Sequence, residues 1–184
     1  MKKIISLYCF AIVLLISISA NAQSIYDYTV MDIDSNEFAM SQLAGKKVMI
    51  VNVASECGLT PQYKHLEDLY RKYQDSNFII IGFPTNDFMK QEPGTNAEIK
   101  EFCSTKYDIT FPIMSKITVK GDEIEPLYLW LTQKQLNGFE DTKVKWNFQK
   151  YLISEDGKIE KVINPMVKPN NDKIIRWIEG SDDH

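Results

Sequence analysis

Two kinds of apolar pattern alternate along this chain and predict the order of its strands and helices. Residues 47–53 and 77–83 are short apolar runs rich in β-branched side chains, as in strands buried on both faces. Between them, apolar residues recur at helical spacing over 61–74. A strand, a helix and a second strand in this order predict a right-handed parallel crossover.

The rest of the chain predicts antiparallel strands and further helices. Thr95 and Glu98 form a capping box that predicts a helix over 96–106. The other expected elements are a strand over 28–33, an extended segment over 111–119, a helix over 126–133, a hairpin of strands 150–153 and 158–163 around an Asp-Gly turn, and a helix over 172–178. This order predicts an α/β protein with a thioredoxin-like fold, in which helices flank a central mixed sheet.

The first 22 residues predict a signal peptide that is removed from the mature protein. Two lysines precede a mostly apolar core over 4–18, and Ala-Asn-Ala at 20–22 supplies the small-residue cleavage pattern. The apolar run is short and has no stop-transfer flank, so it does not predict a membrane anchor. We expect cleavage after Ala22, export to a bacterial periplasm, and a single domain over residues 23–184.

Composition and charge limit the classes of binding partner that we expect for the mature chain. Removing 22 of 184 residues leaves 162, enough for one domain with a substantial core. Loss of the two signal lysines takes the formal charge from −4 to −6, which gives no reason to expect nucleic acid or a membrane surface. The two remaining cysteines, Cys57 and Cys103, and two histidines lack the spacing of a metal site. Such a cysteine pair can also form a structural disulfide in an oxidising compartment.

Cys57 lies in the loop between the predicted strand over 47–53 and the predicted helix that follows it. Thr60 is the expected N-cap and Pro61 the first helical residue, so free backbone N–H groups should stabilise a Cys57 thiolate. A dithiol oxidoreductase would carry a second cysteine at position 60. With threonine there, the pattern favours a thiolate that attacks oxygen and becomes sulfenic acid. The alternative is a buried, inert cysteine.

Three uncharged hydrogen-bond donors are candidates to accompany Cys57. Gln91 lies in the loop after the second apolar strand, which ends at the same edge of the sheet as Cys57. Trp146 and Asn147 precede the predicted hairpin. Their amide and indole N–H groups can hold a thiolate without carrying charge. Taken singly, each has a structural alternative: a solvated glutamine, a core tryptophan and a turn asparagine.

Three motifs in the same order resemble the glutathione peroxidase family over essentially the whole mature sequence. They are Asn52-Val53-Ala54-Ser55-Glu56-Cys57-Gly58, Gly82-Phe83-Pro84-Thr85-Asn86-Asp87-Phe88 followed by Gln91-Glu92-Pro93-Gly94, and Lys145-Trp146-Asn147-Phe148. The resemblance implies a peroxidase that reduces hydrogen peroxide and organic or lipid hydroperoxides to water or alcohols. It also implies that the catalytic residues are Cys57, Gln91, Trp146 and Asn147. Position 57 is cysteine, so the chain is similar to the selenium-free branch and needs no cofactor.

The resemblance further implies how the enzyme is re-reduced. Many cysteine-type members use a second cysteine on the following helix and then a thioredoxin-like protein. In this chain the family position falls on Ser104, and Cys103 stands one residue earlier, rotated by about 100°. We expect Cys103 to be the resolving cysteine, since it is the other mature cysteine. A buried structural Cys103, with direct reduction of Cys57 by glutathione, remains the alternative.

Departures from the family pattern bear on assembly and specificity. Asp87 stands where the family usually has glutamine, and Thr85 stands where some members have another cysteine. The segment over 136–143 is short, which resembles compact monomeric members with an open site. Two other function classes remain: an exported thiol–disulfide oxidoreductase, against which Thr60 argues, and a non-enzymatic peroxide sensor.

Overall fold

A four-stranded mixed sheet forms the centre of the computed structural model, which describes residues 23–181. Its strands, in spatial order, are β4 (Phe78–Pro84), β3 (Lys47–Val53), β5 (Lys150–Ile153) and β6 (Ile159–Ile163). β3 and β4 are parallel, whereas β5 is antiparallel to both β3 and β6. The predicted crossover, hairpin and mixed sheet are therefore confirmed, and the predicted signal peptide lies outside the described residues.

The register of the sheet brings three loops to one edge. Val53 at the end of β3 pairs with Pro84 at the end of β4, so both parallel strands finish at the same level. Lys150 at the start of β5 pairs with Val51 near the end of β3. The loops after β3 and β4 and the segment before β5 therefore meet at this edge, where ligands bind in open α/β sheets.

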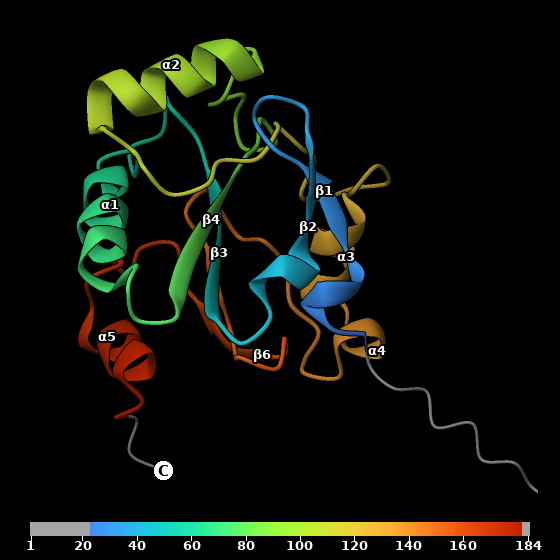
Figure 1. Cartoon of the computed structure of the whole chain (residues 1–184). Coiled ribbons are helices and arrows are strands. Elements are labelled where there is room, and N and C mark those ends of the chain that lie inside the picture. Colours follow the sequence, from blue (N-terminus) through green and yellow to red (C-terminus); the bar gives the residue numbers. More distant parts are fainter. Residues whose placement is uncertain (1–22, 182–184) are drawn as a thin grey trace, which may run out of the picture.

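Helices cover both faces of the sheet (Figure 1). Met49 and Val51 of β3 pack into one core with α1 (Gln62–Tyr73) and α5 (Asp172–Glu179), while Val48 and Ile50 pack into the other. This alternation follows from the two-residue period of a strand. The second core includes α3 (Pro126–Thr132), and α2 (Asn96–Tyr107) crosses one end of the molecule. The smaller elements are η1 (Ile25–Asp27), β1 (Thr29–Met31), β2 (Glu37–Ala39), η2 (Met40–Leu43) and α4 (Lys134–Asn137).

Several local predictions differ from the structure. The helix after Cys57 begins at Gln62, and its N-cap is Pro61 without a side-chain cap. Thr60 is not the N-cap, because its hydroxyl is bound within the preceding loop. The extended segment over 111–119 forms isolated bridges rather than a ladder strand, and β2 and α4 were not predicted. By contrast, the capping box of α2 is confirmed.

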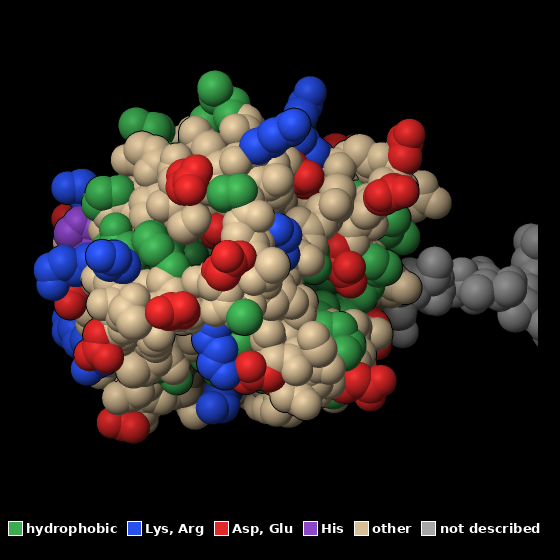
Figure 2. All heavy atoms as spheres, turned by 90° about the horizontal axis from the view of Figure 1, so that it is seen from above, with side chains coloured by type: hydrophobic (Ala, Val, Ile, Leu, Met, Phe, Trp, Pro, Cys, Tyr) green, Lys and Arg blue, Asp and Glu red, His purple; other side chains and the backbone are tan. Residues whose placement is uncertain are grey.

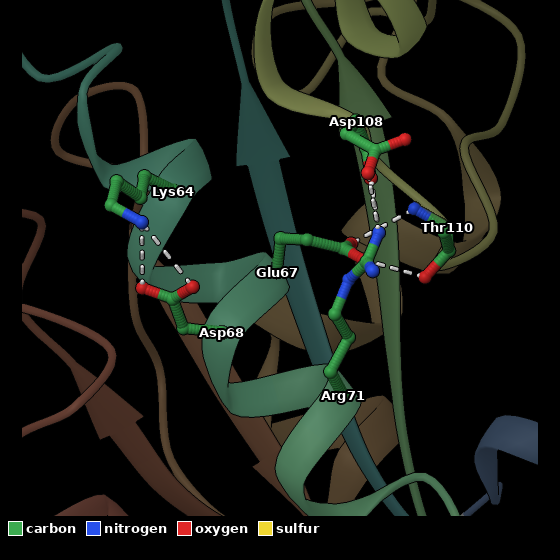
Figure 3. A network of polar contacts seen from close by, with 6 residues as sticks. All are labelled: Lys64, Glu67, Asp68, Arg71, Asp108 and Thr110. Atoms are coloured by element: carbon green, nitrogen blue, oxygen red, sulfur yellow. Dashed lines mark hydrogen bonds and ion pairs between the residues drawn. The ribbon is translucent and has the colours of Figure 1, made fainter.

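A buried carboxylate fastens the C-terminal end of α2 to α1 (Figure 3). Glu67 accepts hydrogen bonds from Thr110 N–H at 2.8 Å, from the Thr110 hydroxyl at 2.6 Å and from Arg71 Nε at 2.5 Å. Arg71 also donates to Asp108, the left-handed residue that ends α2, at 2.9 and 3.0 Å. The side chain of Glu67 is 5% exposed. It therefore fixes the point where the chain leaves α2.

Replacing Glu67 should destabilise the fold far more than breaking an exposed ion pair on the same helix. Glu67→Ala leaves Thr110 and Arg71 without their shared acceptor, and we expect it to lower the free energy of unfolding by about 2 kcal/mol. Lys64→Ala removes the Lys64–Asp68 pair, whose side chains are 72% and 58% exposed, and should cost less than about 0.5 kcal/mol. Urea unfolding of both variants checks this expectation, and equal costs would contradict it.

Candidate active site

The loop that carries Cys57 is held by its own backbone and by one threonine. Cys57 N–H donates to Thr60 Oγ1 at 3.0 Å, and the Thr60 hydroxyl donates to the carbonyl of Ala54 at 2.8 Å. Leu59 N–H points at Cys57 Sγ, 3.4 Å away. Cys57 is 7% exposed and its thiol is free. A backbone N–H directed at sulfur stabilises the thiolate, which is the reactive form.

The loop after β4 is tied to the Cys57 loop at two points. Glu56 N–H donates to the carbonyl of Gln91 at 3.0 Å. The hydroxyl of Ser55 donates to Oε1 of Glu92 at 2.6 Å, and Glu92 is fully buried. Burial raises the pKa of the Glu92 carboxyl, and the Ser55 hydrogen bond acts against this shift. These two contacts hold the backbone of Gln91 and Glu92 beside the Cys57 loop.

The segment before β5 is anchored by Asn52, the next-to-last residue of β3. Its side chain donates to the carbonyl of Trp146 at 3.2 Å and accepts from Gln149 N–H at 3.2 Å. Its own carbonyl accepts from Phe148 N–H at 2.6 Å, and Phe148 has a positive φ of 68°. The Asn147 amide then donates to Oε1 of Gln91 at 3.0 Å. Asn52 thus brings the tryptophan-asparagine pair to the edge that holds Cys57.

The four residues assigned by resemblance are placed at one edge of the sheet. Gln91 and Asn147 are directly hydrogen-bonded, and Glu56 joins the Gln91 backbone to the residue before Cys57. Trp146 is half-buried, with its ring 5.4 Å from that of Phe88. Their roles stay predictions at this point. The arrangement offers a buried thiol beside neutral N–H donors.

Cys103 lies on the inner face of α2, as a free thiol that is 3% exposed. Ser104, at the family's usual resolving position, is exposed. Burial raises the pKa of the Cys103 thiol to about 11, and the neighbouring Tyr63 hydroxyl acts against this shift. Cys103 therefore faces the core, in surroundings that favour its protonated form.

Two buried charged residues near the site escaped the sequence analysis. The sequence analysis named Glu92 only as part of a motif, and included Lys150 only as the first residue of a predicted strand. Lys150 is fully buried, and its ammonium donates to Gln62 Oε1 at 2.6 Å, to the carbonyl of Val167 at 2.6 Å and to that of Pro165 at 3.2 Å. Burial lowers its pKa to about 7. A lysine that opens an otherwise apolar strand was the available signal.

The surface above α2 carries acidic, basic and apolar side chains in mixture, without a field of one sign (Figure 2). Among residues 23–181, no helix is long and apolar enough to cross a membrane. No group of three or more His, Cys, Asp or Glu side chains in that range could hold a metal ion. The face seen in Figure 2 therefore shows no patch of one charge sign of the kind that binds an extended charged polymer.

Comparison with known proteins decides the family. The model of the glutathione peroxidase family matches residues 25–132. The chain belongs to the glutathione peroxidase family. It is 48% identical over 147 residues to the glutathione peroxidase-like peroxiredoxin gpx1 of Schizosaccharomyces pombe, covering 79% of this chain and 92% of the relative. It is 41% identical over 163 residues to the hydroperoxy fatty acid reductase gpx1 of Synechocystis, covering 85% and 94%.

A solved structure agrees with this assignment. The crystal structure of Trgpx in apo form superposes with a TM-score of 0.67 at 38% identity, covering 86% of this chain and 97% of that one. The predicted thioredoxin-like α/β fold is thereby confirmed. As a glutathione peroxidase family member the protein is a thiol peroxidase, and this outcome favours the peroxidase among the three function classes drawn from the sequence.

Thr60 should be needed for the reactive geometry of this glutathione peroxidase. Thr60→Val removes the acceptor of Cys57 N–H and the donor to Ala54, so we expect the free energy of unfolding to fall by about 2 kcal/mol. Peroxide consumption should slow by about tenfold, which corresponds to 1.4 kcal/mol in the barrier. Thr60→Ser keeps the hydroxyl and serves as control. Wild-type rates in Thr60→Val would show that the loop does not depend on this hydroxyl.

Buried Lys150 should make the stability depend on pH. Its folded pKa of about 7 lies below the ordinary 10.5, so the unfolded chain binds more protons between these values and stability rises with pH there. Relative to Lys150→Met, the wild-type free energy of unfolding should rise by about 1 kcal/mol per pH unit from pH 8 to 9.5. Urea unfolding at several pH values measures this, with exposed Lys64→Met as control. Parallel profiles for wild type and Lys150→Met would contradict it.

Proposed function

We propose that this protein reduces hydrogen peroxide and organic hydroperoxides at Cys57. The thiolate attacks the distal peroxide oxygen, the O–O bond breaks, and Cys57 becomes sulfenic acid. Water or an alcohol leaves after taking up one proton. The observation that carries the proposal is the backbone N–H of Leu59 directed at Cys57 Sγ, at the edge where Gln91 and Asn147 meet.

In this proposal, the polar side chains that line the reaction site are those of Gln91, Trp146 and Asn147. Oε1 of Gln91 accepts from Asn147, so the Nε2 group of Gln91 is the end left to donate toward the site. Amide and indole N–H groups stabilise developing negative charge without bringing a full positive charge to the sulfur. They hold the thiolate and orient the peroxide.

The substrate class includes bulky lipid hydroperoxides as well as hydrogen peroxide. The Synechocystis relative is a hydroperoxy fatty acid reductase, which supports this choice. Met89 is 77% exposed in the loop that carries Gln91 and offers an apolar contact for an acyl chain. The short segment over 136–143 supports a monomer with an open site.

Cys103 is the proposed resolving residue. It attacks the sulfenic acid to form a Cys57–Cys103 disulfide, which a thioredoxin-like protein or glutathione reduces. Cys103 lies within α2 and faces the core, so the proposal includes local unwinding of α2 that brings the two Cα atoms within about 7 Å. Among the residues of α2, Ile99 and Cys103 are the buried ones, which keeps the cost of this opening low.

The proposed cellular setting is the bacterial periplasm. The predicted signal peptide over residues 1–22 supports export, with cleavage after Ala22. No membrane anchor is proposed, and the thiol reductant is a co-substrate rather than a bound cofactor. Selenium has no place in the proposed chemistry because position 57 is cysteine.

Steady-state peroxide consumption by the mature protein tests the proposal. With thioredoxin as donor, Cys57→Ser should abolish turnover and Cys103→Ser should lower it by at least about 100-fold, or 2.7 kcal/mol. Ser104→Ala, on the same helix, is the control and should retain activity. If Cys103→Ser keeps full activity with glutathione, Cys57 acts alone. Absence of peroxide consumption by the wild type would exclude the proposed reaction.

A further inference from the structure

Lys150 is a fully buried lysine whose three hydrogen-bond acceptors are all neutral. Its ammonium donates to the side-chain carbonyl of Gln62 and to the backbone carbonyls of Pro165 and Val167. Burying an ammonium among neutral acceptors costs free energy, and the lowered pKa of Lys150 follows from this burial. An apolar side chain of similar length would remove the cost. The lysine therefore calls for an explanation beyond packing.

The ammonium of Lys150 joins three segments of the chain at the active-site edge. Lys150 opens β5, shortly after the tryptophan-asparagine pair. Its two backbone acceptors lie in the loop after β6, and Gln62 is the first residue of α1. The Nε2 group of Gln62 also donates to the carbonyl of Pro165, at 2.8 Å, so both side chains share one acceptor. Lys150 and Gln62 together hold the start of α1 against the loop after β6.

The start of α1 relies on Gln62 because no capping side chain holds it. The N-cap residue, Pro61, makes no side-chain cap. Gln62 is 5% exposed, and both ends of its amide are engaged. Its backbone N–H donates to the carbonyl of Leu59 at 2.9 Å, which closes the turn between the Cys57 loop and the helix. The contacts of the Gln62 side chain therefore also fix Leu59.

The N–H of Leu59, which is directed at Cys57 Sγ, needs this support. It belongs to the peptide that joins Gly58 to Leu59. Gly58 is exposed, and no atom of residues 23–181 other than its chain neighbours lies within 4 Å of where its Cβ would stand. The glycine therefore leaves this peptide free to rotate. The carbonyl of Leu59 belongs to the next peptide plane, so its hydrogen bond from Gln62 restricts the rotation from the other side.

We propose that Lys150 is a positioning residue for the reaction at Cys57 and acts through the side chain of Gln62. This contact fixes the turn in which Leu59 directs its N–H at the sulfur. Lys150 itself touches neither the sulfur nor the peroxide in this mechanism. The inference deepens the proposed function and rests on the attack of the Cys57 thiolate on the peroxide.

The reactivity of Cys57 in two variants tests this role. Lys150→Met keeps an apolar stem but removes the ammonium, and Gln62→Met removes its side-chain acceptor while leaving it two carbonyls. Alkylation by iodoacetamide at pH 7 is followed from the mass of the peptide that contains Cys57. Sulfenic acid formation is followed by mass after one equivalent of hydrogen peroxide. We expect both reactions to be about fivefold slower in both variants, because the thiolate loses a well-directed N–H.

The direction and the pH profile of the effect separate positioning from a loss of stability. Cys57 is 7% exposed, so a loosened fold would expose the thiol and make alkylation faster, not slower. The deficit in alkylation should shrink with rising pH, since at high pH the thiol ionises without help from the N–H. A deficit that stays constant over the whole pH range would contradict the proposed role.

Lys47→Met is the matched control. The ammonium of Lys47 also donates to two backbone carbonyls, those of Trp177 and Ile178, at 2.5 and 3.4 Å. Lys47 lies at the start of β3, at the opposite end of the strand from the Cys57 loop. Its replacement should leave both rates at Cys57 unchanged. A slowing equal to that in Lys150→Met would show a general effect of losing a carbonyl-bound lysine and would overturn the inference.

A double variant tests the route through Gln62. If Lys150 acts through this side chain, the protein with both substitutions should react no more slowly than Lys150→Met alone. Slowing factors that multiply would show two independent influences and would overturn the proposed route.

The outcomes distinguish this inference from the proposed function. If the wild type consumes no peroxide, the proposed reaction fails and the positioning role is overturned with it. If the wild type consumes peroxide and both variants match its rates at Cys57, the positioning role alone is overturned. Should Lys150→Met fail to fold, Gln62→Met decides by itself, since a wild-type rate of alkylation in that variant excludes the role.

Discussion

The active-site edge of this peroxidase depends on the hydrogen bonds of one buried amide, that of Asn52. Three segments distant in sequence must meet there, and none of them has regular secondary structure. Asn52 uses its side chain to hold Trp146 and Gln149, and its backbone carbonyl to hold Phe148. The left-handed conformation of Phe148 is maintained by these contacts. Without them, Asn147 would lose the position from which it binds Gln91.

Local sequence patterns predicted the elements that depend on neighbours in the chain. The parallel strands, the capping box of α2 and the β5–β6 hairpin follow from apolar period and turn chemistry, and each is found. The resemblance of three motifs predicted Cys57, Gln91, Trp146 and Asn147 as the catalytic residues. They lie in loops at one edge of the sheet, and their roles stay a prediction. The local patterns and the motifs both depend on residues that are close together in the sequence.

The features that escaped prediction depend on contacts between distant segments. Thr60 was expected as an N-cap, but its hydroxyl serves Cys57 and Ala54 because the loop turns back on itself. Lys150 occupies a buried strand position, because acceptors from α1 and from the loop after β6 surround its ammonium. No periodicity encodes such partners. Short β2 and α4 likewise form against tertiary neighbours rather than from a strong local pattern.

The placement of full charges around the site has a chemical reason. The hydrogen bond directed at Cys57 Sγ comes from the neutral backbone N–H of Leu59, whereas the buried Lys150 is engaged by carbonyls and the buried Glu92 by a hydroxyl. A cation bound directly to a thiolate would lower its pKa, and nucleophilicity falls with it. Neutral N–H donors stabilise the thiolate while leaving more of its reactivity toward peroxide oxygen. The buried carboxyl of Glu92 instead fixes the loop that carries Cys57, through its hydrogen bond from Ser55.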